Sequence, residues 1–413
     1  MSIKLRRVAK LVANQEDAGS LPYVALENVE SWTGHLTSAF EDLLLRESPD
    51  AGVCLVEHGD VLFGKLRPYL AKIWRAPERV YASSELMAIR GGQDVDSRWL
   101  EYLAMSKPVV EWAIATSEGV KMPRTNWEKL GEFIIDDLPS LKAQGAIADF
   151  LEGETERIDA LLASRQRLLE LLALRRTAVM LAGVSGAYTS TSSVSSPVPW
   201  LEAQPPDWRT AKLSLVASLG SGHTPSRSHP EWWTDCTVPW ITTGEVAEMR
   251  TDREEYVRET RERISDLGIA NSSATIHPAG TVVLCRTASA GYSAIMASDM
   301  ATSQDFATWT CGPLLRPRFL LLCLRAMRQD LLGRLAMGST HKTIYMPDIE
   351  SLRIPLPDVQ EQDRIVVEVW ARLHKINRLE DTLKAQSELL VERRRALITA
   401  AVTGQLDIPE VAA

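Results

Sequence analysis

The sequence lacks the cysteine and histidine patterns of a metal site or a disulfide framework. Its 413 residues include 5 cysteines, an odd number, and no two of them form a CxxC pair. The 7 histidines show no metal-ligand spacing such as HxxxH. We therefore expect free or buried thiols, no bound metal, and the reducing environment of the cytoplasm.

Long hydrophobic runs are also absent. A membrane-spanning helix needs about 20 consecutive apolar residues, whereas the densest apolar stretch here, residues 319–324, is far shorter. Residues 1–11 are charged and have no apolar core of a signal peptide. With 45% hydrophobic and 24% charged residues, the chain has a globular composition, and its 413 residues predict two or three domains. We expect no membrane partner.

The motifs of the obvious catalytic classes are missing as well. The chain has no Asn-Pro or Asp-Pro dipeptide, although an amino-methyltransferase uses one to position its target amine. It has no GxxxxGK[ST] phosphate loop, since the GxxxxGK run at residues 59–65 is followed by Leu66, so ATP hydrolysis is not expected. Pro49-Asp50 and Pro357-Asp358 could each begin a nuclease pattern, but no lysine stands two places beyond a suitable acid. We therefore predict a subunit without catalytic activity.

The sequence also lacks an excess of basic residues. The formal net charge is −8; residues 1–138 hold 16 basic and 21 acidic side chains, and residues 208–356 hold 16 and 15. A protein that binds DNA by itself usually presents a strongly basic face. The isolated chain is therefore expected to bind nucleic acid weakly.

The clearest positive feature is a segment that occurs twice. Residues 144–186 and 362–404 are related by a constant offset of 218, and fourteen identities lie in register when the comparison starts at Pro139 and Pro357. The best-matched parts are ELLALRRTA, from Glu170, and ELLVERRRA, from Glu388. Such a match is not expected by chance, so the chain is an internal duplication.

Each copy of this repeat predicts one long helix. Neither copy contains proline after its start, each ends at a glycine, and apolar residues recur at heptad-like spacing. At 1.5 Å per residue, an uninterrupted helix over residues 144–182 would be roughly 58 Å long. Such a helix has an apolar stripe that needs a partner, and the other copy supplies one in a two-helix coiled coil. The alternative is a pair of unrelated amphipathic core helices, which the repeat disfavours.

The repeat divides the chain into six parts. The run YTSTSSVSSPVP, from Tyr188, has too little apolar content to pack, which is typical of an exposed linker. We predict a first head at residues 1–138, a central spacer helix at 139–186, a linker at 187–207, a second head at 208–356, a C-terminal spacer helix at 357–404 and a tail at 405–413.

Both heads are predicted to mix strands and helices. The second head repeats the first loosely, since residues 239–241 and 280–284 match two strands expected in the first. The predicted fold is therefore α/β (α+β), with two globular domains and two long helices in an internal pseudo-repeat. The elements expected in the first head are strands at 22–26 and 59–63, a turn and a further strand within 64–72, a helix over 98–116 and a loop at 121–127.

Several polar segments of the heads are candidates for contact with nucleic acid. Hydroxyl, amide and guanidinium groups hydrogen-bond phosphates and base edges, and loop 220–228 of the second head offers all three. The first head has a basic cluster with interleaved aromatic residues, KLRPYLAKIWR from Lys65, and equivalent loops precede the two long helices. The candidate DNA-binding residues are Lys65, Arg67, Tyr69, Lys121, Arg124, Thr224, Ser226, Arg227, Thr243, His341 and Lys342.

Each candidate also has a plainer interpretation. Loop 220–228 could be an ordinary surface loop, and the basic cluster could be a solvated strand face. Trp232, Trp233 and Trp240 are expected in the core rather than as stacking platforms, since TVPWI is typical of a buried strand.

Four features together resemble the specificity subunit of type I restriction–modification enzymes, and the resemblance covers the whole chain. They are GDVLFGKLRPYLAK at 59–72, LGSGHTPSRS at 219–228, VPWITTGEV at 238–246, and the repeated helices. The resemblance implies two target-recognition domains separated by two long antiparallel helices. It also implies that each head reads one half of a bipartite DNA sequence, and that the helices set the spacing between the halves.

The same resemblance implies the partners. These are double-stranded DNA, two methyltransferase subunits and, in some complexes, motor–nuclease restriction subunits. S-adenosylmethionine, ATP and Mg are then expected on the partner subunits, and no cofactor on this chain. Because the first head has residues 12–20 in place of loop 220–228, the two heads are expected to read different half-sites. The alternative is a coiled-coil scaffold or orphan adaptor whose heads no longer bind DNA.

Overall fold

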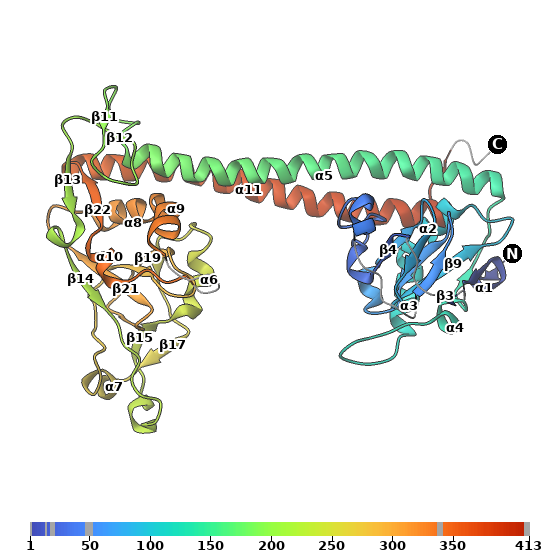
Figure 1. Cartoon of the computed structure of the whole chain (residues 1–413), viewed down its shortest axis with the longest axis horizontal. Helices are drawn as coiled ribbons and strands as arrows, with labels where there is room; N and C mark the ends of the chain where they lie inside the picture. The colour runs from blue at the N-terminus through green and yellow to red at the C-terminus, as the bar shows by residue number, and fades with distance from the viewer. Residues whose placement is uncertain (1, 13–14, 17–20, 46–52, 337–341, 409–413) are drawn as a thin grey trace. The chain divides into compact units, whose positions relative to one another are not determined.

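The computed structural model divides into two compact units. Unit 1 comprises Met1–Gln166 and Lys384–Ala413, and unit 2 comprises Arg167–Leu383. Each unit holds one head together with parts of two long helices, α5 (Leu141–Val184) and α11 (Val359–Val402) (Figure 1). The structure describes residues 2–12, 15–16, 21–45, 53–336 and 342–408.

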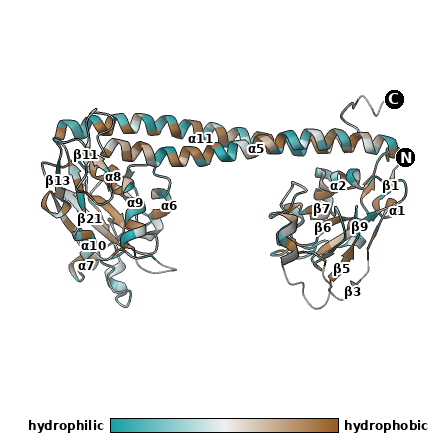
Figure 2. Cartoon of the chain, turned by 45° about the horizontal axis from the view of Figure 1, so that its top comes forward, coloured by the Kyte–Doolittle hydropathy of each residue, from teal (hydrophilic) through white to brown (hydrophobic). Residues whose placement is uncertain are grey.

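The two long helices pack against each other in antiparallel directions within each unit. In unit 1, Leu151 near the start of α5 shares a hydrophobic core with Ile398 near the end of α11. In unit 2, Val179 near the end of α5 shares a core with Val369 near the start of α11. Both helices mix hydrophobic and hydrophilic residues along their length (Figure 2). The predicted fold class, α/β heads with two long antiparallel helices, is confirmed.

None of the described helices is both long enough and apolar enough to cross a membrane.

The first head is built on two four-stranded sheets. Its strands are β1 (Ile3–Lys4), β2 (Ala9–Leu11), β3 (Gln15–Glu16), β4 (Tyr23–Val24), β5 (Val53–Val56), β6 (Val61–Gly64), β7 (Ile73–Arg75), β8 (Val80–Ala82), β9 (Leu86–Gly91) and β10 (Ile134–Ile135). One sheet has the order β2-β9-β6-β7 and is antiparallel; the other has the order β3-β5-β8-β4, with β4 parallel to β8. β1 pairs with β10.

Helices cover one face of the first of these sheets. They are α1 (Leu5–Val8), α2 (Ser97–Met105), α3 (Lys107–Ala115) and α4 (Trp127–Leu130). Successive side chains of a strand point to opposite faces, and all three of Val61, Leu62 and Phe63 in β6 are buried. Val61 and Phe63 share a core with α2 and α3, while Leu62 belongs to a separate core with the second sheet. The central strand is apolar on both faces because both are covered.

The second head repeats this plan with a larger sheet. Its strands are β11 (Val194–Ser195), β12 (Ala203–Gln204), β13 (Arg209–Lys212), β14 (Ala217–Ser221), β15 (Val238–Ile241), β16 (Tyr256–Val257), β17 (Glu262–Ile264), β18 (Val282–Cys285), β19 (Ser293–Met296), β20 (Ala301–Thr302), β21 (Phe306–Cys311) and β22 (Arg353–Leu356). The sheets have the orders β14-β21-β18-β19-β16 and β17-β15-β20, and the pairs β11–β12 and β13–β22 are separate. β11 and β12 lie in the segment predicted as an exposed linker, where Val198 and Leu201 are buried against the second head.

The strand β18 repeats the arrangement of β6, because Val282 and Leu284 face one core and Val283 faces another.

Short helices and helical turns complete the second head. The α-helices are α6 (Val246–Met249), α7 (Asp266–Ala270), α8 (Pro317–Ala326), α9 (Arg328–Asp330) and α10 (Met346–Glu350). The other helical turns of the two heads are η1 (Leu26–Asn28), η2 (Phe40–Leu45), η3 (Pro68–Leu70), η4 (Leu213–Leu215), η5 (Pro230–Trp233), η6 (Thr243–Glu245) and η7 (Leu331–Leu335).

Two details of the first head differ from the sequence-based expectation. The helix predicted over residues 98–116 is two helices, because Ser106 is extended (φ −65°, ψ 148°) and Pro108 cannot continue a helix that lies before it. The further strand predicted within residues 64–72 begins only at Ile73. Residues 64–72 instead contain η3 between two left-handed residues, Arg67 (φ 51°) and Ala71 (φ 43°).

The duplication extends to the hydrogen bonds at the start of each long helix. Gln144 and Gln362 are both fully buried. The side-chain carbonyl of Gln144 accepts from the amide of Asp96 at 2.9 Å, and that of Gln362 accepts from the amide of Arg316 at 2.8 Å. Each side-chain amide donates to two backbone carbonyls. Those carbonyls belong to Asp94 and Pro139 in unit 1, and to Leu314 and Pro357 in unit 2.

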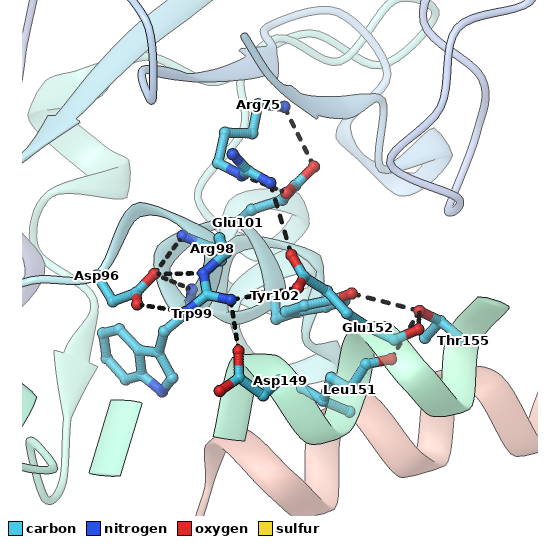
Figure 3. A network of polar contacts seen from close by, with 10 residues as sticks. All are labelled: Arg75, Asp96, Arg98, Trp99, Glu101, Tyr102, Asp149, Leu151, Glu152 and Thr155. Carbon is cyan, nitrogen blue, oxygen red and sulfur yellow. Dashed lines mark hydrogen bonds and ion pairs between the residues drawn. The ribbon is translucent and has the colours of Figure 1, made fainter. Parts of the chain in front are cut away.

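Charged side chains also join α2 of the first head to α5 (Figure 3). Arg98 lies on α2 and donates to Asp149 of α5 at 2.6 Å and to Glu152 of α5 at 3.2 Å. The hydroxyl of Tyr102 lies 3.3 Å from that of Thr155, and burial raises the pKa of Tyr102 to about 12. The contact between this head and α5 therefore combines exposed ion pairs with a buried pair of hydroxyl groups, next to the hydrophobic core that Leu151 shares with the head.

Candidate nucleic-acid interface

Two segments of the first head that are distant in the sequence lie side by side and bring the predicted DNA-binding residues of this head together. The amide of Arg67 donates to the carbonyl of Pro123 at 2.7 Å, and the amide of Thr125 donates to the carbonyl of Lys65 at 2.9 Å. These bonds join residues 64–72 to the loop that precedes α4. The joint brings together Lys65, Arg67, Tyr69, Lys121 and Arg124.

The loop before α4 is a small hairpin with an exposed tip. The amides of Glu118 and Arg124 each donate to the other residue's carbonyl at 2.9 Å, and Gly119 turns the chain with φ of +91°. Val120 and Lys121 at the tip are exposed. A lysine and an apolar side chain on a protruding tip can contact phosphates and thymine methyl groups, respectively.

The cations of this site differ in how they are paired. Arg124 donates to both carboxylate oxygens of Glu85, at 2.8 and 2.9 Å, and the ammonium of Lys65 donates to the carbonyl of Ser84 at 2.6 Å. Arg67 and Lys121 are exposed, and neither forms an ion pair with any residue in the described part of the chain. Arg67 and Lys121 are therefore the cations most readily available to an anionic ligand.

The remaining basic residues of the predicted cluster are used inside the head. The ammonium of Lys72 donates to the carbonyl of Leu26 at 2.9 Å, and burial lowers the pKa of Lys72. Arg75 donates to Glu101 at 3.1 Å, and Trp74 is buried. These residues stabilise the head and do not belong to the exposed surface.

In the second head, loop 220–228 leaves the end of β14 and is held by local contacts. Arg227 donates to Glu262 at 2.8 Å, and its guanidinium carbon lies 3.8 Å from the centroid of a Trp233 ring. The hydroxyl of Ser226 lies 2.7 Å from that of Ser228. Stacking and pairing orient the Arg227 guanidinium while it remains exposed, so its outer edge can bind a phosphate or a base.

A close backbone contact explains the glycine in this loop. A β-carbon on Gly222 would lie 1.9 Å from the carbonyl oxygen of Thr302, and the amide of His223 donates to the same carbonyl at 3.0 Å. Next along the loop, the hydroxyl of Thr224 donates to the side chain of Gln304 at 2.6 Å. The base of the loop is therefore fixed against β20 and the turn that follows it.

Arg286 is a candidate that the sequence reasoning missed. Its amide donates to the carbonyl of Asp305 at 2.8 Å, its Nε donates to the carbonyl of Gln304 at 3.0 Å, and its own carbonyl accepts from Ile344 at 2.8 Å. Lys65 makes the same three contacts in the first head, with Glu85, Ser84 and Thr125. The match between residues 59–63 and 280–284, extended by two residues, would have paired Lys65 with Arg286.

The other predicted residues of the second head flank this position. Thr243 begins η6 and is exposed; the carbonyl of Ile241, two residues earlier, accepts from the amide of Ser303 at 2.9 Å. Lys342 is exposed, and its ammonium donates to the carbonyl of Leu332 at 3.1 Å. His341 lies outside the described residues. Within the described part of the chain, no group of His, Cys, Asp and Glu side chains could hold a metal ion.

Comparison with known families and curated proteins agrees with this arrangement. Residues 205–389 match the type I restriction modification DNA specificity domain. The specificity subunit of the type I restriction enzyme MjaIX from Methanocaldococcus jannaschii is 26% identical over 187 residues, which is 45% of this chain and 41% of that protein. The specificity subunit of EcoR124I/EcoR124II from Escherichia coli is 22% identical over 165 residues, 39% of each protein. Each match spans less than half the length of the curated relative.

Two solved structures show the same fold. A chain from a study of complex assembly and conformational transition of the type I R-M system has a TM-score of 0.77 and 19% identity, over 98% of both chains. The HsdS subunit from Thermoanaerobacter tengcongensis has a TM-score of 0.57 and 20% identity, over 98% of this chain and 97% of that one. In its matched specificity domain and in its overall fold, the chain is therefore similar to the specificity (S) subunits of type I restriction–modification systems.

Proposed function

We propose that this chain is the DNA sequence-specificity subunit of a type I restriction–modification complex, and that each head reads one half of a bipartite target. One observation carries the proposal: the two heads hold a cation, Lys65 or Arg286, through the same three contacts. The neighbouring side chains differ, since Ser84 in the first head corresponds to Gln304 in the second. A duplicated scaffold with unlike side chains suits two half-sites of different sequence.

The residues of each site have distinct proposed roles. Lysine acts as a point charge for phosphate, whereas arginine forms paired hydrogen bonds with guanine. Lys121 and Lys342 are therefore assigned to the DNA backbone. Arg67, Arg227 and Arg286 are assigned to base edges or to phosphates beside them, and Lys65, which matches Arg286, to the same position in the first head. The hydroxyl-bearing residues Tyr69, Thr224, Ser226 and Thr243, together with Arg124 and His341, complete the proposed contact set.

We also propose that α5 and α11 dock two methyltransferase subunits. Large apolar side chains are exposed at positions related by the 218-residue offset: Leu161 with Leu379, and Leu171 with Leu389. A surface that occurs twice suits two copies of one partner, and exposed apolar side chains are characteristic of protein interfaces. S-adenosylmethionine, ATP and Mg would then be bound by partner subunits, with motor–nuclease subunits joining in some complexes. Such a complex acts on cellular DNA, so we place it in the cytoplasm.

The charge of the chain supports this division of labour. Neutralisation of phosphates supplies most non-specific DNA affinity, and a chain with a net charge of −8 supplies little of it. The partner subunits would contribute that attraction, while this chain reads bases. The complex should bind DNA tightly and the isolated chain weakly.

Methylated-base sequencing of whole genomes tests the proposal. Cells that express the chain together with its methyltransferase should carry methylation at a bipartite motif of fixed spacing, and deletion of the gene for this chain should abolish it. Substitution of residues 208–356 with the corresponding head of another specificity subunit should change one half of the motif only. A motif that persists after the deletion would contradict the proposal.

A further inference from the structure

Each long helix carries one arginine that is buried within its unit. Arg176 on α5 is 8% exposed and Arg394 on α11 is 4% exposed, and the two are related by the 218-residue offset. Their sequence neighbours Arg175 and Arg393 are exposed. Burial of a guanidinium is unfavourable unless hydrogen bonds and an opposite charge compensate for it. The partners of these two arginines therefore show what the buried charges do.

In unit 1, Arg394 links three elements. Its Nε and Nη2 contact the carboxylate of Asp159 on α5, at 3.1 and 3.3 Å. Its Nη1 donates to the carbonyl of Trp32 at 2.8 Å, and its Nη2 donates to the carbonyl of Thr33 at 2.6 Å. One side chain of α11 thus fastens α5 and a turn of the first head at the same point.

That turn leads directly to the candidate interface. Trp32 is held in the left-handed region (φ 68°), and the guanidinium carbon of Arg395 lies 4.4 Å from its ring centroid. The indole N–H of Trp32 donates to the carbonyl of Tyr69 at 3.1 Å, and its amide donates to the carbonyl of Ala71 at 3.0 Å. A continuous path of polar contacts therefore runs from α11 through Trp32 to the loop that carries Arg67 and Tyr69.

Polar contacts hold this edge of the junction, beside the hydrophobic core that the head shares with α5 and α11. A cavity of about 220 Å³ lies beside the arginine, with Thr33, His35, Glu101, Glu152, Asp159 and Arg394 among its lining residues. A junction with open volume can rock unless directional bonds restrain it. Arg394 supplies four such bonds.

In unit 2, Arg176 occupies the corresponding position. Its Nη2 donates to Asn377 at 2.6 Å and to Glu380 at 3.0 Å, both on α11. Glu380 also accepts from Arg253 of the second head at 3.0 Å, and Arg253 donates to Asp381 at 2.7 Å. The second cluster again connects α5, α11 and a head. It is less complete, because Nη1 of Arg176 has no partner within the described part of the chain.

We propose that Arg394 and Arg176 are positioning residues that fix the orientation of each head on the helix pair and so restrict the spacing between the two half-sites. The inference rests on the proposed function. One additional base pair moves a half-site by about 3.4 Å and rotates it by about 34°. A complex that rejects a spacing wrong by one base pair needs heads that do not rock through such an angle.

The test measures spacing selectivity separately from base preference. The full chain, co-produced with its methyltransferase, is given duplexes that keep both wild-type half-sites while the spacer is one or two base pairs longer or shorter. Arg394→Met should accept a spacer that differs by one base pair about tenfold better, relative to the native spacer, than the wild type does. The bases read in each half-site should be unchanged, and Arg394→Lys should lie between the two.

Arg393→Met is the matched control, since it removes from the adjacent position an exposed charge whose ion pair with Glu154, at 3.8 Å, is long and solvated. It should behave as the wild type does. Asp159→Asn keeps the size of the side chain and places in unit 1 the residue type found at Asn377. It should relax the spacing in the same direction but less, and it answers the question if Arg394→Met does not fold.

Three results would overturn the inference while leaving the proposed function intact. They are unchanged spacing selectivity in both Arg394→Met and Asp159→Asn, altered base preference, and equal relaxation in Arg393→Met. If the wild type selects no bipartite sequence, the proposed function fails, and electron–electron distances decide on the junction. Nitroxides on encoded ketone side chains at Thr37 and Glu388 should give a wider distance distribution in Arg394→Met. An unchanged width would refute the inference.

Discussion

Lys65 and Arg286 occupy the same place in the two heads and present different cations, which makes them a matched pair. Substitution of either by alanine should weaken recognition of one half-site by about 1–3 kcal/mol, which is roughly a fivefold to 150-fold loss, and leave the other half-site unaffected. Methylation rates on duplexes with single base changes in each half-site would measure this. Each variant is the control for the other. Equal losses at both half-sites would contradict the assignment of one head to one half-site.

His35 is expected to give the stability of the first head a weak dependence on pH. Its imidazole lies 3.2 Å from Asp159, and this hydrogen bond raises the pKa of His35, with Glu30 acting in the same direction and burial and Arg394 opposing. A folded-state pKa above the unfolded value of about 6.5 gives a stabilisation that is complete below that value and is lost as the pH rises through the folded pKa.

The melting temperature of His35→Gln should therefore fall further below that of the wild type at pH 5.5 than at pH 8.5. The difference should be small, because the imidazole is more than half exposed. Differential scanning fluorimetry at the two pH values would measure it, with His374→Gln as a control on α11. A gap between wild type and His35→Gln that widens as the pH rises would show that the assigned pair is wrong.

At the residue scale, sequence reasoning found identities but could not assign their roles. Gln144 and Gln362 were visible as a repeated pair, yet nothing in the sequence indicates that each bonds to a backbone segment about 50 residues away. Arg124 was identified as a cation, but its pairing with Glu85 depends on strand register. The exposed subset, Arg67 and Lys121, could be separated from Lys72 and the other internal basic residues only in three dimensions.

At the element scale, Gln362 decides how α11 joins the second head. Gln362→Ala would leave the amide of Arg316 and two carbonyls without their partner in a buried site. Each unsatisfied group costs about 1–3 kcal/mol, so the second head should be destabilised by about 3 kcal/mol after local relaxation. Amide hydrogen exchange at Arg316 should accelerate accordingly. Gln360→Ala, at an exposed position of the same helix, is the control and should leave exchange unchanged.

Long elements were predicted well and short ones were not, for a physical reason. The helices α5 and α11 carry a periodic pattern over 44 residues each, and the repeat doubled the signal. The helix expected over residues 98–116 is interrupted at Ser106, because Pro108 outweighs the local helix propensity. The parallel pairing of β4 with β8 joins residues almost 60 positions apart and has no local signature.

At the scale of the whole molecule, the proposed spacing function makes a quantitative prediction about helix length. Insertion of three heptads after Gln166 in α5 and after Leu383 in α11 would lengthen the helix pair by about 32 Å. The insertion would also rotate one end of the helix pair relative to the other by about 60° in the left-handed sense. Nine base pairs advance a duplex by about 31 Å and turn it by about 309°, which equals about 51° in the left-handed sense. If the helix pair lies along the duplex, the variant should methylate the same two half-sites with a spacer nine base pairs longer.

A single inserted heptad separates this geometry from mere flexibility. It adds about 10.5 Å and turns the seam by about 20°, whereas three base pairs add a similar length but rotate the duplex by about 103° in the opposite sense. The added length of the helix pair would then match that of the DNA spacer, but their rotations would not. This variant should therefore methylate poorly at every spacer length. Methylation by the single-heptad variant at a spacer three base pairs longer, with native efficiency, would mean that rotation is not controlled. The helices could not then act as a rigid spacer.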